Sequence, residues 1–391
     1  MPRWHSRSVA NWYEAHESRD LLSFALGAAF GRWDIRVASG DVLPLPQQDF
    51  FSPLPVGSPA QFRGPSGMPV SRADEEALRD EGRWAYPIPI QWGGLLVDDP
   101  GHQLDVETKV REVLEIGWSE RMTKLEEEAS DVLGVRTLRE YICKPSGFFT
   151  DHLNRYSKSR RKAPIYWQLA TPSASYAVWC YYHRLTRDTF FRVANDCVMP
   201  KVEHEDRKLN TLRQEYGPDP SSKQRKEIDT QETFVAELRA FLTEVERIAP
   251  LWNPNLNDGV IINFAPLWRL VPQNKAWQKE CKKAWDKLVK GDYDWTHLAM
   301  HLWPERVVPK CLDDRSLAIA HGLEDDFWIQ DGDEKWHKCK PPEGGWDQYT
   351  QQVVEERSSP GVQAALTSLL EAPTLGSRTT GTKRRSKSGA S

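Results

Sequence analysis

The segment Arg155-Tyr-Ser-Lys-Ser-Arg-Arg-Lys-Ala-Pro-Ile-Tyr-Trp-Gln-Leu-Ala-Thr-Pro-Ser-Ala-Ser-Tyr-Ala-Val-Trp-Cys-Tyr-Tyr-His-Arg184 has the clearest pattern in the chain. Its second part contains two apolar, aromatic-rich runs of strand length, separated by the turn-forming residues 171–175. Two such runs around a short turn predict a β-hairpin. The first part carries five cations within eight residues, so we expect a cationic entry loop formed by Arg155, Lys158, Arg160, Arg161 and Lys162.

Outside this segment the sequence predicts mainly helices. Residues 201–250 form a charged pair of predicted helices, broken at Gly217-Pro-Asp-Pro220. The second helix has apolar residues at intervals of three and four, which form one stripe suited to packing against another helix: Phe234, Leu238, Phe241, Val245 and Ile248. We interpret this pair as a spacer or a partner surface. The expected fold class is α+β and mostly helical, with a β-hairpin or small sheet around 163–184 and the charged helical hairpin at 201–250.

The chain divides by composition into six segments. We expect a helix that belongs to a larger upstream architecture at 1–40, a Pro/Gly-rich connection at 41–103, helices with the cationic loop and hairpin at 104–200, a helical spacer at 201–250, an aromatic-rich region at 251–345, and a terminal helix with a disordered basic tail at 346–391. The apolar segment Leu21–Phe30 is typical of the middle of a larger architecture, and its face would be prone to aggregation if it were exposed.

Overall composition is that of an ordinary globular chain. Its 391 residues include 52 Lys+Arg and 56 Asp+Glu, so any affinity for nucleic acid must come from a local patch. Six scattered cysteines without a C-x-x-C pair favour reduced thiols over a disulfide framework or a zinc ribbon. No apolar run approaches ~20 residues, and no secretory signal is present. We expect an intracellular, cytoplasmic, soluble protein with no membrane partner.

Three short motifs could carry chemistry, and each has a structural alternative. Asp98–Asp99 could bind a metal, but a turn and helix N-cap after a short strand is favoured. His297 and His301 share a helix face, but Leu298 stands where a zinc peptidase needs Glu. Residues 253–256 only partly match the Asn-Pro-Pro-aromatic motif of amino-methyltransferases. Neither a P-loop nor a G-x-G-x-x-G is present. We therefore predict no catalytic residue, no metal ligand and no cofactor-binding residue.

The cationic loop remains as a candidate binding site. Its basic side chains, with interleaved serines, could bind phosphate oxygens. Tyr156, Tyr166 and Trp167 could pack on sugar or stack on an unpaired base. The alternative is a solvated loop that leads into a hairpin, with the aromatic rings in the core. Both interpretations stay open on sequence alone.

Several segments resemble the C-terminal part of large adenine-specific DNA methyltransferases, namely the PglX-like enzymes of BREX and DISARM phage-defence systems, which are similar in layout to type IIG restriction-modification proteins. The resemblance covers roughly residues 10–330. The matching motifs are Leu22-Ser-Phe-Ala-Leu-Gly-Ala-Ala-Phe-Gly-Arg-Trp-Asp34, Leu96-Val-Asp-Asp-Pro-Gly101, Arg155-Tyr-Ser-Lys-Ser-Arg-Arg-Lys-Ala-Pro-Ile-Tyr-Trp167, Trp179-Cys-Tyr-Tyr-His-Arg-Leu185, Leu256-Asn-Asp-Gly-Val260 and Ala265-Pro-Leu-Trp268.

The resemblance implies N6-adenine methylation with S-adenosylmethionine for the full-length family, and target recognition on double-stranded DNA for the part matched here. The catalytic half of the family is absent from this sequence, so we expect a truncated or split product, or catalysis by a separate methyltransferase chain. The expected DNA-binding residues are Arg155, Lys158, Arg160, Arg161 and Lys162, with Tyr166 and Trp167 behind them. The alternatives are a structural subunit that docks other defence-system proteins, or an inert fragment.

Overall fold

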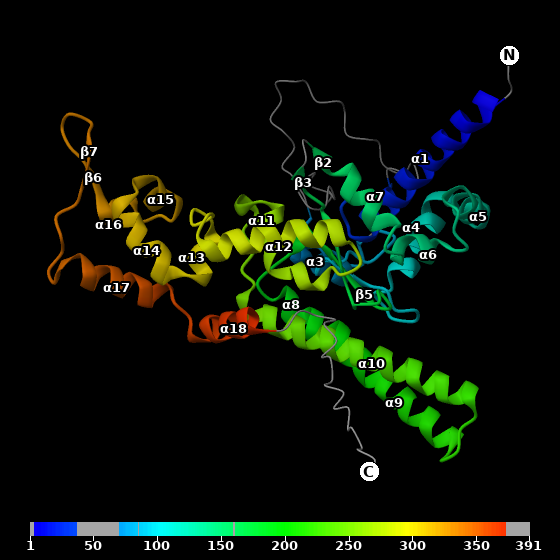
Figure 1. Cartoon of the computed structure of the whole chain (residues 1–391). Helices are drawn as coiled ribbons and strands as arrows, with labels where there is room; N and C mark the ends of the chain where they lie inside the picture. The colour runs from blue at the N-terminus through cyan, green and yellow to red at the C-terminus, as the bar shows by residue number, and fades with distance from the viewer. Residues whose placement is uncertain (1–3, 37–69, 85, 159–160, 373–391) are drawn as a thin grey trace, which may run out of the picture.

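The computed structural model describes residues 4–36, 70–84, 86–158 and 161–372 (Figure 1). Side chains are described for the same residues except 4–16, Lys158 and Arg161. The described chain is mostly helical and contains small antiparallel sheets of two or three strands. The α+β prediction is therefore confirmed.

The central element is a three-stranded antiparallel sheet. Its strands are β1 (Leu95–Val97), β4 (Tyr166–Ala170) and β5 (Ala177–Tyr181), in the order β1-β5-β4. Every residue of these strands is buried, which explains why their sequences are continuous apolar runs rather than alternating ones. The hairpin predicted at 163–184 is confirmed as β4–β5, and we call it the buried hairpin.

Helix α1 (Trp4–Ala29) covers part of this core. Leu22, Leu26 and Phe30 are buried, and the ring of Phe30 stacks on Tyr166 with centroids 5.2 Å apart. A Cβ atom added at Gly27 would lie 2.4 Å from the Trp33 ring, so only glycine allows this close approach. The core of this chain covers most of the apolar segment 21–30, so the segment does not form an exposed apolar face.

A layer of helices follows β1. It comprises α4 (Val106–Trp118), η1 (Ser119–Arg121), α5 (Met122–Leu133), α6 (Leu138–Cys143) and α7 (Phe148–Arg155). The Pro/Gly-rich connection predicted at 41–103 contains one helix that we did not predict, α3 (Arg72–Asp80). A capping box between Ser71 and Asp74 starts it. Residues 37–69 of that connection lie outside the described residues.

The charged helical hairpin is confirmed as α9 (Met199–Tyr216) and α10 (Ser222–Ile248), which leave the body side by side as an arm in Figure 1. At its base lie η2 (Tyr182–Arg184), α8 (Thr189–Arg192) and the π-helical turn η3 (Val193–Val198). Leu238, Phe241 and Val245 from the predicted stripe are fully buried in the core of this chain. The arm therefore presents mainly polar surface to solvent.

The aromatic-rich region folds into short helices around α12 (Lys275–Lys290), whose Trp277 and Trp285 are buried as expected for a packed helix face. Its other elements are η4 (Ala249–Leu251), η5 (Leu256–Asp258), α11 (Val260–Phe264), η6 (Ala265–Leu270), α13 (His297–Leu302), α14 (Pro304–Asp313), α15 (Arg315–Ala320), α16 (Glu324–Phe327), and a hairpin that we did not predict, β6 (Trp328–Gln330) with β7 (Trp336–Lys338).

The end of the chain contains two helices where one was predicted, α17 (Gly345–Arg357) and α18 (Pro360–Glu371). The predicted basic tail from residue 373 lies outside the described residues. All six cysteines are free thiols, as expected. Among the described residues, no helix has the length and apolar character needed to cross a bilayer.

Candidate nucleic-acid interface

The cationic loop forms a short hairpin of its own. Strand β2 (Ser157–Lys158) pairs antiparallel with β3 (Arg161–Lys162), and Lys158 faces Arg161 in the backbone register. We call residues 155–162 the cationic hairpin. It connects the end of α7 to β4, so it lies at the edge of the central sheet. Arg160 falls between the two strands in sequence and lies outside the described residues.

Two ion pairs with flanking helices hold the base of the cationic hairpin. Arg155 pairs with Asp20 of α1, and Lys162 Nζ lies 3.3 Å from Glu280 Oε1 of α12. The hydroxyl of Ser157 also donates to the carbonyl of Leu153, at 2.7 Å. The base is therefore fixed on both sides. In sequence, the remaining three cations fall between the two anchored residues: Lys158, Arg160 and Arg161.

Arg32 adds a further cation beneath the hairpin. Its guanidinium donates to the hydroxyl of Tyr156 at 2.9 Å and lies over the ring of Trp33, at 4.5 Å from the ring centroid. Within the described part of the chain, it has no carboxylate partner. Sequence reasoning did not single out Arg32, although it falls in one of the motifs quoted for the resemblance. Only the fold brings it next to Tyr156.

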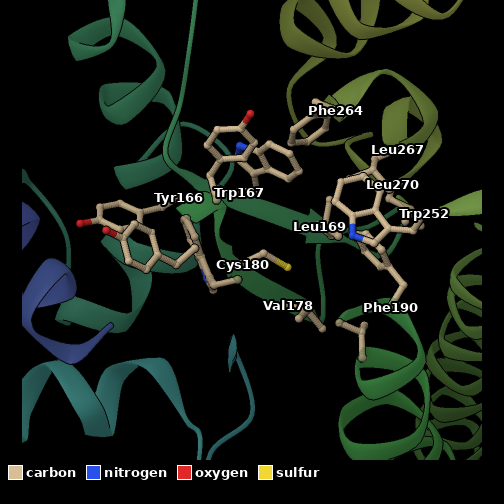
Figure 2. Close-up of a cluster of buried hydrophobic side chains, with 14 of the residues drawn as sticks. Tyr166, Trp167, Leu169, Val178, Cys180, Phe190, Trp252, Phe264, Leu267 and Leu270 are labelled. Carbon is tan, nitrogen blue, oxygen red and sulfur yellow. The ribbon is translucent and has the colours of Figure 1, made fainter. Parts of the chain in front are cut away.

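Tyr166 and Trp167 are buried, which favours the alternative that their rings lie in the core and position the cationic hairpin from behind over contact of the rings with sugar or bases. Both side chains are 0% exposed. Trp167 packs on Phe264, with centroids 4.4 Å apart, and on Trp252, as Figure 2 shows. Its indole N–H donates to the carbonyl of Pro164 at 2.8 Å. The two rings support the cationic hairpin from the core, and a nucleic acid cannot reach them.

His152 links the cationic hairpin to the buried hairpin. Its Nε2 atom accepts hydrogen bonds from the backbone N–H groups of Ile165 and Tyr166, at 3.0 and 3.1 Å. Burial, reinforced by the positive charges of Arg32 and Arg155, lowers the pKa of His152 to about 3. The neutral ring therefore fixes the chain where it enters β4. Sequence reasoning missed this residue, since a lone histidine gives no sign of its partners.

The Asp98–Asp99 pair belongs to an ion-pair network. Arg139 pairs with Asp98 and with Asp105, the latter at 2.6 Å, and Lys201 Nζ lies 2.6 Å from Asp99. The N-cap of α4 is Asp105. The favoured interpretation therefore correctly expected a helix N-cap after the strand, but the capping residue is neither Asp98 nor Asp99. In the described ranges no cluster of three or more potential ligands is placed to hold a metal ion.

His297 and His301 lie one turn apart on α13, His297 exposed and His301 half-buried. The Nδ1 atom of His297 lies 3.0 Å from the carboxylate of Asp258, which also accepts the backbone N–H of His297. Burial lowers the pKa of His301, which disfavours its charged form. Asn253, from the partial methyltransferase motif, accepts a hydrogen bond from Arg187 at 2.7 Å. These contacts give His297, His301 and Asn253 structural roles.

The described residues do not fit S-adenosylmethionine, the cofactor that the resemblance implies for the full-length family. The central sheet has three antiparallel strands and lacks the parallel βαβ unit with a glycine-rich loop that usually holds such a nucleotide. One described cavity, of about 590 Å³ between α1 and α5, is lined by carboxylates of Glu17, Glu128 and Asp131. We therefore derive no methyl-transfer step from this chain.

Comparison with known proteins gives one relevant similarity. No protein-family model matches the chain. A stretch of 186 residues is 29% identical to the adenine-specific methyltransferase PglX of Lacticaseibacillus casei (strain Zhang). The similarity covers 44% of this chain and 15% of that protein. The chain is thus distantly similar to a minor part of an adenine-specific methyltransferase.

Proposed function

We propose that the chain is the DNA-recognition and scaffold part of an adenine-specific (N6) DNA methyltransferase in a phage-defence or restriction-modification system. The observation that carries the proposal is the cationic hairpin. Asp20 and Glu280 anchor this basic segment at its base, and three further cations fall between the two anchored residues in sequence. The similarity to PglX supports a relation to adenine methyltransferases.

Phosphates of double-stranded DNA are the ligands that suit this hairpin. Lys and Arg side chains that neutralise phosphates release counterions, which gives affinity with little dependence on base sequence. His152 and the buried rings hold the chain where it leaves the cationic hairpin and enters β4, so this described base loses little conformational entropy when DNA arrives. In this role the cations set affinity and register on the duplex.

Catalysis is assigned to another module. S-adenosylmethionine and the target adenine would be held by a methyltransferase domain, either in a longer form of the protein or in a separate chain. The present chain would hold the duplex against that domain. Its helical layers and the α9–α10 arm would then provide the scaffold.

The test is a titration of the whole chain with a duplex, read by fluorescence anisotropy at salt concentrations from about 50 to 200 mM. We expect affinity that falls linearly with the logarithm of salt concentration. The tip variant, Arg160→Ala with Arg161→Ala, should bind the duplex about tenfold more weakly. A wild-type chain with no affinity at the lowest salt concentration would overturn the proposal.

A second function is favoured by the α9–α10 arm. Its outer part carries ion pairs such as Arg213 with Glu232, at 2.7 Å. The arm projects from the body in Figure 1. Such an arm suits docking of another subunit of a defence system. Under this alternative the chain would have no duplex affinity, and the same titration separates the two functions.

A further inference from the structure

Helix α12 has one apolar face and one basic face. The apolar face is buried and holds the helix firmly on the core: Trp277, Cys281, Ala284, Trp285 and Leu288. The opposite face carries exposed lysines at intervals of four and seven residues, which place them on one side of a helix. We call these residues the α12 lysine face: Lys275, Lys279, Lys283 and Lys290.

These four lysines are not neutralised by neighbouring acids. The helix contains only two carboxylates, and both have other partners: Glu280 pairs with Lys162, and Asp286 pairs with Lys282 at 2.7 Å. The α12 lysine face forms no ion pair with any described residue. Four unpaired cations on a rigid helix, with a rise of 1.5 Å per residue, form a basic line of about 22 Å.

The lysine face lies next to the cationic hairpin. Lys162 of β3 reaches Glu280, which is flanked in sequence by Lys279 and followed three residues later by Lys283. Gln273, just before α12, donates to the carbonyl of Gln168 in β4 at 2.9 Å. The hairpin and the helix are therefore held against the same sheet, at adjoining positions.

We propose that the α12 lysine face, together with Lys162 at the base of the cationic hairpin, binds the phosphates of duplex DNA. The inference rests on the proposed function and adds a second element to its binding site. Successive phosphates of one DNA strand are spaced about 3.4 Å apart along the duplex axis. A basic line of about 22 Å is therefore long enough to contact several of them. Base-independent contact is the chemistry expected of lysine.

Glu280 has a particular position in this surface. It is the acid that neutralises Lys162, and it stands beside the lysine face. A phosphate that approaches Lys162 must compete with the Glu280 carboxylate for the same ammonium group. Glu280 therefore weakens DNA binding while it anchors the hairpin in the free protein.

The first test replaces three of the four lysines of the α12 lysine face in the full 391-residue chain. We expect Lys275→Ala, Lys279→Ala and Lys283→Ala together to lower duplex affinity about tenfold or more and to reduce the slope of log affinity against log salt by about 2 to 3. Alanine preserves helix propensity, so circular dichroism should show an unchanged fold. The matched control removes three exposed lysines elsewhere, Lys223→Ala, Lys226→Ala and Lys335→Ala, and should bind like the wild type.

The second test is the Glu280→Gln variant, which should bind the duplex about threefold more tightly because it frees Lys162. If the lysine-face variant binds like the wild type while the tip variant is weakened, the inference is overturned and the proposed function stands. If the control loses as much affinity as the lysine-face variant, net charge explains the effect and the inference is also overturned. If the wild-type chain does not bind the duplex, both proposals fail.

Discussion

The cationic hairpin and the buried hairpin follow each other directly in sequence, since β3 ends at Lys162 and β4 begins at Tyr166, but they are built in different ways. The strands of the first are two residues long and are held by ion pairs at their base. The strands of the second are five residues long and buried throughout. The comparison shows that aromatic residues can follow cations directly in sequence without lying on the same exposed surface of the molecule.

The largest effect is expected in the buried hairpin. Replacing Trp167 by alanine removes a fully buried ring that packs on Phe264 and Trp252, so the free energy of unfolding should fall by about 3–5 kcal/mol. Urea denaturation of the wild type and the variant measures this loss. A loss below about 1 kcal/mol would mean that the ring is not part of the core.

The next effect tests the link between the two hairpins through His152. The pKa of this side chain is about 3 in the folded protein and about 6.5 when unfolded, so the unfolded state takes up a proton first as the pH falls. Its contribution to stability is fully present above pH 6.5 and is lost as the pH falls towards 3. Acidification from pH 7 to 5 should therefore lower the free energy of unfolding by about 2 kcal/mol through this residue.

The His152→Gln variant provides the comparison for that pH effect. Glutamine keeps a hydrogen-bond acceptor but does not titrate, so the acid-induced loss of stability should shrink by the same amount. Urea denaturation of both proteins at the two pH values measures the difference. Equal losses in the wild type and the variant would show that His152 is protonated in the folded state as well.

The smallest effect is expected at the anchor of the cationic hairpin on α1. The ion pair between Arg155 and Asp20 is substantially exposed, with side-chain exposures of 39% and 63%. Arg155→Ala should change the free energy of unfolding by less than about 1 kcal/mol, because solvent screens exposed pairs. A larger loss in urea denaturation would mean that the cationic hairpin contributes to the core as the buried hairpin does.

The sequence predicted those elements whose pattern of apolar, polar and turn-forming residues is contained in one continuous segment. The buried hairpin and the α9–α10 arm follow from turn residues and periodicity, and both are present. Strand β1 was expected, but its pairing with β5 depends on residues far away in sequence. Helix α3 was missed because its capping box stands in a segment dominated by proline and glycine.

The candidate site shows the same limit. The cations of the hairpin could be named from sequence, whereas their anchors could not, since Asp20 and Glu280 come from two helices far apart in sequence. The burial of Tyr166 depends on Phe30, and that of Trp167 on Phe264; neither contact leaves a trace in the local pattern. Long-range packing decided which residues could face a ligand.

The salt dependence of duplex binding by the tip variant tests the central claim most directly. The account predicts that Arg160→Ala with Arg161→Ala reduces the slope of log affinity against log salt by about 1 to 2, because up to two phosphate contacts are lost. The free energy of unfolding should stay within about 0.5 kcal/mol of the wild type, so that a change in binding is not a change in folding. An unchanged slope with unchanged affinity would contradict the account.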